Sequence, residues 1–163
     1  MRFAEPNVGI PPTLPRDHGA HPAFRTEWWY FTGWFESPEL SEPLGVQITF
    51  FRSAPNVNVL NPSAFSPKQL LFAHAAVAMP SAGKLKHDQI IRRAGSGGAL
   101  IQRTNQQVLS IQMPGWQLQT AQGEQWQCKI NTPQLPIDLR IEQTQTPWTH
   151  AQRGYSHNGP NAE

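Results

Sequence analysis

Three ionisable side chains lie inside, or at the ends of, segments that are otherwise apolar. Glu27 comes directly before a double tryptophan, Arg52 follows two phenylalanines, and His74 interrupts the run LFAHAAV at residues 71–77. A charge buried without a partner costs roughly several kcal/mol, so Glu27 and Arg52, if interior, are expected to find partners, with each other as one pairing. One interpretation is a structural ion pair at the end of a barrel. The other is a general acid or base in a cavity, which makes Glu27 and His74 the candidate catalytic residues.

A second group of polar residues lies just upstream, in the run Asp17-His18-Gly19-Ala20-His21. A zinc site needs three or four convergent ligands, and only His74 or Glu27 offers a further ligand outside this run. The favoured interpretation is that Asp17 and His18 hold the N-terminal segment by hydrogen bonds while Gly19 allows a tight turn. No metal is expected. No cofactor is expected either, since the phosphate-loop, dinucleotide and nucleophile-elbow motifs are absent from the sequence.

The aromatic segment that follows Glu27 would present aromatic rings on both faces of a strand. Trp29 and Phe31 alternate with Trp28, Tyr30 and Trp34. One face can fill a barrel while the other packs against the N-terminal segment or a neighbouring domain. Alternatively, one face lines a cavity for an apolar ligand. The candidate ligand-binding residues are Trp28, Trp29, Tyr30, Trp34, Phe50, Arg52, Phe72 and His74.

The elements that must position these side chains are predicted to be short strands. The chain contains 16 prolines, a density that disfavours long helices. The alanines of Gln69–Met79 are compatible with a helix, but strand neighbours on both sides favour a strand there. Strands are expected at Glu27–Glu36, Leu44–Arg52, Gln69–Met79, Leu85–Arg93, Val108–Met113, Trp116–Thr120, Gln125–Ile130 and Pro136–Gln145. About eight strands of this kind indicate an all-β antiparallel barrel or sandwich, and an eight-stranded barrel can enclose one small ligand.

Composition excludes several classes of function. The formal net charge of the 163 residues is +2 and the basic residues are scattered, so nucleic acid is not expected as a partner. The longest apolar runs fall short of the ~18 residues of a membrane span. The single cysteine, Cys128, rules out an internal disulfide and is interpreted as a packing residue. The compartment stays open: periplasmic or membrane-associated if a signal has been removed, otherwise cytoplasmic.

Long motifs connect the sequence with a known family. The run PRDHGAHPAFRTEWWYFTG at Pro15–Gly33 resembles the AttH-like proteins of the lipocalin-like superfamily, which also contains hydroxyneurosporene synthase, a carotenoid 1,2-hydratase. The resemblance continues through Gln47–Ser53 and Leu71–Val77. RGYSHNGPN, which begins at Arg153, resembles the junction between the two domains of such proteins.

The resemblance implies a lipocalin-like β-barrel domain at residues 26–150, after an irregular arm at residues 1–25. Residues 151–163 resemble a linker to a second lipocalin-like domain, which is the expected partner domain. The implied function is binding of a lipophilic small molecule such as an isoprenoid, a polyene or a lipid-like molecule. The alternatives are a hydratase or polyene cyclase, or an interaction domain with a transporter-associated partner. The hydratase branch has an acidic residue after its double tryptophan, whereas this chain continues Phe31-Thr32-Gly33.

Overall fold

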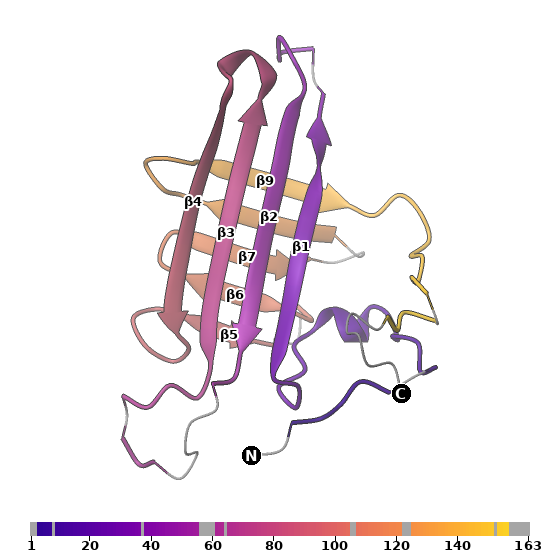
Figure 1. Cartoon of the computed structure of the whole chain (residues 1–163), viewed down its shortest axis with the longest axis vertical. Helices are drawn as coiled ribbons and strands as arrows, with labels where there is room; N and C mark the ends of the chain where they lie inside the picture. Colours follow the sequence, from indigo (N-terminus) through magenta and orange to yellow (C-terminus); the bar gives the residue numbers. More distant parts are fainter. Residues whose placement is uncertain are drawn as a thin grey trace.

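Two antiparallel β-sheets make up the protein in the computed structural model (Figure 1). The structure describes residues 3–7, 9–36, 38–55, 61–63, 65–104, 107–121, 125–151 and 153–156. Within these residues the strands are β1 (Thr26–Phe35), β2 (Leu44–Ser53), β3 (Leu70–Met79), β4 (Lys84–Arg93), β5 (Leu100–Gln102), β6 (Ser110–Met113), β7 (Trp116–Thr120), β8 (Gln125–Ile130) and β9 (Ile137–Glu142). Two short 3-10 turns, η1 (Arg16–His18) and η2 (Pro80–Ala82), complete the regular structure.

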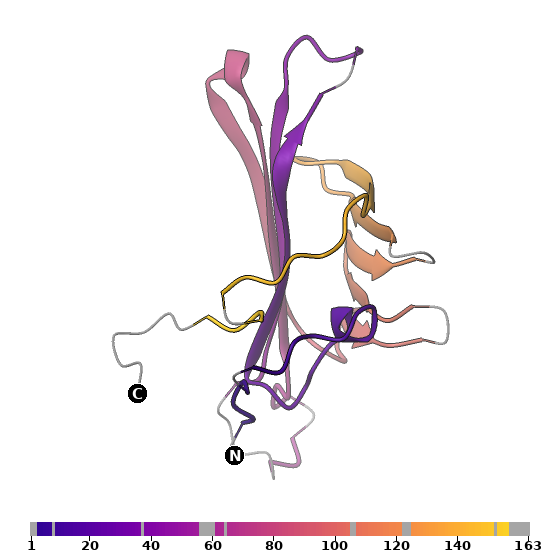
Figure 2. The ribbon, with the colours of Figure 1, turned by 90° about the vertical axis from the view of Figure 1, so that its right-hand side faces the viewer.

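The first sheet contains the four long strands in the order β1-β2-β3-β4, each paired with the next along the chain. The second sheet contains the five shorter strands in the order β5-β6-β7-β8-β9. Figure 1 shows the second sheet behind the first, with its strands running across the long ones. The ends of β1–β4 extend well past the second sheet in the side view (Figure 2). The first sheet is therefore covered over only part of one face.

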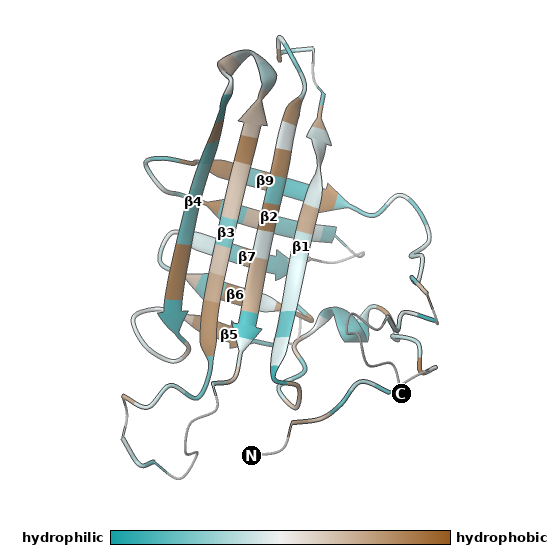
Figure 3. Cartoon of the chain, in the orientation of Figure 1, coloured by the Kyte–Doolittle hydropathy of each residue, from teal (hydrophilic) through white to brown (hydrophobic). Residues whose placement is uncertain are grey.

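The core lies between the two sheets. From the first sheet it takes the inward side chains of β2 and β3, among them Ile48, Phe50 and Leu71, all fully buried. The hydrophobic colouring of β2 and β3 extends over much of their length (Figure 3). Rings meet across the sheets, with centroids 6.2 Å apart for Phe50 and Trp116. These edge-to-face contacts and the buried apolar area hold the two layers together.

Cys128 is fully buried in the same core, on β8. Burial is the main cause that raises the pKa of its thiol to about 12, with a smaller contribution from Asp138. The thiol therefore stays neutral at ordinary pH, as expected of a packing residue.

The all-β class expected from the sequence is confirmed, with strands where the pattern predicts them. Residues 70–79 form a strand and not a helix. The sheets do not close into a complete barrel, because no pairing joins β4 to β5 or β9 to β1 among the described residues. The short strand β5 is an addition to the expected set.

Most of the linker expected at residues 151–163 lies outside the described residues. In the described part of the chain, no helix is long and apolar enough to cross a membrane.

Candidate functional site

An ion pair between β1 and β2 anchors the N-terminal arm to the first sheet. The antiparallel register places Glu27 beside Arg52, and the Arg52 Nε donates to Glu27 Oε2 at 2.7 Å. Arg52 is fully buried, and its Nη2 donates to the carbonyl oxygens of His21 and Phe24, at 2.9 and 2.8 Å. The pair of charged residues expected from the sequence thus forms, with its guanidinium also bound to the arm.

The Glu27 carboxylate is further occupied by His21. The backbone N–H of His21 lies 2.8 Å from each carboxylate oxygen, and its Nδ1 lies 2.7 Å from Oε1. The other ring nitrogen of His21 is 3.5 Å from Asp17 Oδ1. With a guanidinium, a backbone amide and an imidazole around it, Glu27 acts as a structural anchor in this arrangement.

Asp17 belongs to the same network. Its carboxylate accepts hydrogen bonds from Arg16 and from the backbone N–H of Thr13. The Arg16 guanidinium, followed by the Thr13 amide, holds the pKa of Asp17 well below its usual range. The Trp29 indole N–H donates to the carbonyl oxygen of His18 at 2.9 Å. The expectation that the Asp17 segment holds the arm by hydrogen bonds therefore agrees with this geometry. Among the described residues, no group of three or more His, Cys, Asp or Glu side chains is arranged to hold a metal ion.

His74 lies on the opposite face of the first sheet from Glu27. The register pairs His74 with Thr49, whereas Arg52 pairs with the buried Leu71. The His74 side chain is exposed, and its ring centroid is 5.5 Å from that of Phe51. The two candidate catalytic residues are therefore separated by the sheet and do not form one acid–base site.

The candidate ligand-binding residues divide in the same way. The inward group is Trp29, Phe50 and Arg52, and the outward group is Trp28, Tyr30, Trp34, Phe72 and His74. The inward group packs in the core and the arm anchor. The outward group lies on the face of the first sheet that points away from the second sheet, where Tyr30 and Trp34 are 62% and 73% exposed. The first sheet itself therefore separates the two groups.

An apolar cleft opens where the first sheet extends past the second. It has a volume of about 460 Å³. Leu44 and Val46 of β2 and Val77 of β3 line one wall, while Ile137 and Leu139 of β9 line the other. These side chains are half-buried, so they offer an apolar surface that the protein itself does not fill. Lys86 of β4 also lines the cleft and gives it an ammonium group, whereas the Asp138 carboxylate, on the side of β9 opposite Leu139, is paired with Lys129 at 3.2 Å.

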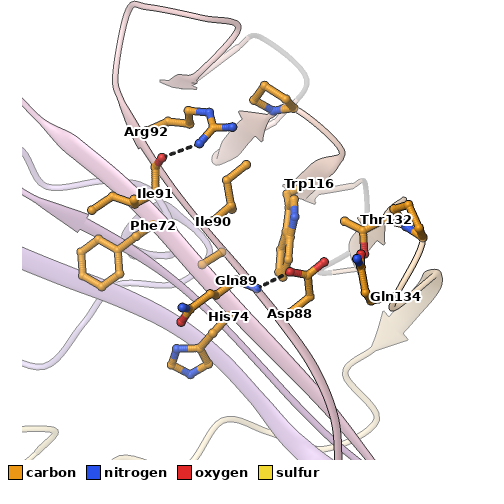
Figure 4. Close-up of a pocket in the computed structure, with 13 residues that line it drawn as sticks. Phe72, His74, Asp88, Gln89, Ile90, Ile91, Arg92, Trp116, Thr132 and Gln134 are labelled. Atoms are coloured by element: carbon orange, nitrogen blue, oxygen red, sulfur yellow. Dashed lines mark hydrogen bonds between the residues drawn. The ribbon is translucent and has the colours of Figure 1, made fainter.

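A larger hollow of about 710 Å³ runs along the β4 edge (Figure 4). Its lining includes His74 and Gln89 on one side of β4 and Trp116 and Thr132 on the other. It therefore wraps around the strand edge instead of forming an enclosed cavity. The Asp88 carboxylate in it accepts a hydrogen bond from the backbone N–H of Gln89.

The cleft residues were not among the candidates chosen from the sequence. The available signal was the alternation at Ile137, Leu139 and Ile141 in the last strand, together with the apolar positions of the second and third. That pattern identifies inward faces. It does not show that one end of the first sheet extends beyond its partner and leaves them half-covered.

The described residues thus form a two-sheet all-β domain with a tethered N-terminal arm and an apolar cleft at the open end of its core. The AttH-like family model matches residues 5–163, and the chain belongs to this family. A solved structure of a candidate AttH from Nitrosomonas europaea is similar to it, with 36% sequence identity and a TM-score of 0.79. The match covers 99% of this chain and 46% of that one, so this chain spans less than half the length of its relative. No curated protein matches the chain.

Proposed function

We propose that this AttH-like domain binds a lipophilic small molecule in the cleft between β2, β3 and β9. The observation that carries the proposal is the half-buried apolar lining of a space of about 460 Å³ at the open end of the core. Pockets of several hundred Å³ with apolar walls and a few polar groups are typical of small-molecule sites.

The ammonium group of Lys86 refines the class of ligand, because it lies among otherwise mainly apolar residues. A molecule with a long apolar body and one polar end would bury its body against Leu44, Val77 and Leu139 and keep its polar end at Lys86. Isoprenoids, polyenes and fatty acids with a terminal polar group have this form. Binding is proposed without catalysis, because Glu27 and His74 lie on opposite faces of the sheet.

A fluorescent polyene fatty acid titrated into the protein tests this proposal. The expected result is saturable binding that weakens about tenfold or more in Leu44→Asn and Leu139→Asn, which place an amide in opposite walls of the cleft. Leu100→Asn is the matched control, since Leu100 is a partly exposed strand leucine outside the cleft. If the probe does not bind, or binds equally to all four proteins, the cleft is not the site.

The second lipocalin-like domain implied by the sequence is likewise a proposal. The length of the solved relative supports it, since this chain matches 46% of that one. A transporter-associated partner rests on the family resemblance alone.

A further inference from the structure

The outward face of the first sheet is free of charged residues over four of the five rows of its register, and the remaining row, which begins at Thr26, ends in Arg93. On β1 the four uncharged rows begin at Trp28 and end at Trp34, and each continues through the paired residues of β2, β3 and β4. The two middle rows are Tyr30-Thr49-His74-Gln89 and Thr32-Gln47-Ala76-His87. The four rows thus contain aromatic, aliphatic, amide, hydroxyl and imidazole groups, and no Asp, Glu, Lys or Arg.

Such a composition differs from that of a solvated sheet surface. Strand faces in contact with water usually alternate charged and polar groups, whereas the centres of protein interfaces are depleted of charge and enriched in aromatic residues. The aromatic side chains here are strongly exposed: Trp28 is 55% exposed and Trp34 is 73% exposed.

The two end rows of this face differ in shape. At one end Trp28, Phe51, Phe72 and Ile91 form a row of large side chains, with the rings of Phe51 and Phe72 stacked at 4.5 Å between centroids. This stacked pair protrudes from the two central strands.

At the other end the same two strands carry Gly45 and Ala78 between Trp34 and Leu85. A hollow of about 490 Å³ lies over these small residues, with Trp34 and Leu85 in its lining and Lys84, at the end of β4, as its one charged lining residue among those described. The face therefore has a projection at one end and a recess at the other, both centred on β2 and β3.

We propose that this face binds the same face of a second copy of the chain. The two-fold axis lies between the first sheets of the two copies, parallel to both sheets and perpendicular to their strands. Such an axis keeps each strand opposite its own copy and reverses its direction. Phe51 then lies over the partner copy's Gly45, and Phe72 over the partner copy's Ala78. The recess of each copy receives the aromatic pair of the other, and both contacts form twice because the interface is isologous.

Charge and area both favour a second copy of the chain as the molecule that binds this face. Burying this face against a surface with unpaired charges would be costly, whereas a second copy presents the same four uncharged rows. Four rows spaced about 6.6 Å apart, across four strands spaced about 4.8 Å apart, cover roughly 500 Å². Two such faces bury roughly 1,000 Å², the size of a weak specific interface. A weak dimer, populated at about 100 µM protein, is expected.

Sedimentation equilibrium of the full chain over a range of concentrations tests the proposal. The wild type is expected to show a monomer–dimer equilibrium, and Ala78→Glu is expected to weaken it about tenfold or more by placing a carboxylate in the recess. Gln112→Glu, an exposed β6 residue on the other sheet, is the control and should leave the equilibrium unchanged. Far-UV circular dichroism confirms that each variant is folded.

A charge pair tests the orientation of the two copies. In the proposed arrangement His74 lies over the partner copy's Ala76. His74→Glu and Ala76→Lys should each weaken the dimer, and the double variant should restore it, because each carboxylate then meets an ammonium group of the other copy. A wild type that stays monomeric at about 100 µM would overturn the proposal. So would a dimer insensitive to Ala78→Glu, or a double variant that dissociates more than either single one.

Discussion

At the scale of single residues, the best-defined polar feature is the anchored pair of Glu27 and Arg52. The guanidinium is fully buried and donates to Glu27 and to two carbonyl oxygens of the arm. Among the residues that the structure describes, its Nη1 has no hydrogen-bond partner. The negative charge of Glu27 is therefore the main compensation for burying the charge of Arg52.

Glu27→Gln is therefore expected to destabilise the protein by about 3 kcal/mol, since it leaves a buried guanidinium without a counter-charge. Urea unfolding followed by far-UV circular dichroism measures the change in the free energy of unfolding. Glu142→Gln, an exposed carboxylate on β9, is the control and should change it by less than about 0.5 kcal/mol. A loss as small as that of the control would show that the pair is not needed for stability.

The sequence predicted the type of this feature but not all of its members. Glu27 and Arg52 were identifiable because a charge within an apolar strand needs a partner. His21 was identified only as part of a possible metal motif, and its bond to Glu27 depends on how the arm turns back onto β1. Irregular segments have no hydrophobic period, so their side-chain contacts cannot be predicted from the sequence pattern.

At the scale of elements, the β6–β7 hairpin depends on a glycine that no other residue can replace without strain. Gly115 has φ +77° in the turn after Pro114, and a Cβ at this position would lie 2.9 Å from the carbonyl oxygen of Asn131. Proline followed by glycine suits a turn whose third residue has a positive φ. The hairpin forms part of the second sheet. A backbone shift at Gly115 would therefore displace β6 and β7, whose inward side chains lie in the core.

Gly115→Ala is expected to lower the free energy of unfolding by about 1–3 kcal/mol, from backbone strain and the close contact. Gly33→Ala is the matched control: Gly33 lies in β1, and an added Cβ would meet nothing within 4 Å. This control is expected to be neutral or slightly stabilising. Thermal or urea unfolding compares the two variants, and equal losses would contradict the role assigned to the turn.

The strands themselves were predictable because their period of two is a local property. The order of β1 to β4 follows the chain, because consecutive strands usually lie next to each other in a sheet. The short strand β5 at Leu100–Gln102 was missed, since three residues are too few to show an alternation. Closure of the barrel depends on pairing between distant strands, which the local pattern cannot establish.

At the scale of the whole molecule, the first sheet presents three different surfaces. Its inward face packs on the second sheet, the end of that face opens into the cleft, and its outward face lacks charged groups in four of its five rows. The alternation of Trp28 and Trp29 predicted that both faces of β1 would be aromatic. It could not indicate which face was inward, because both faces are comparably apolar. The eight ligand-binding candidates were therefore split between two faces.

A single core shared by both sheets predicts a single unfolding transition. The buried cluster joins Ile48, Phe50 and Leu71 of the first sheet to Leu118 and Trp126 of the second. Neither sheet buries its inward face without the other, so they should unfold together. Urea unfolding followed by tryptophan fluorescence, which reports on Trp126 among others, should coincide with unfolding followed by far-UV circular dichroism. Leu118→Ala should shift both curves equally, with a loss of about 2–5 kcal/mol, because it opens a cavity in the shared core. Separate transitions for the two signals would show that the sheets are independent units.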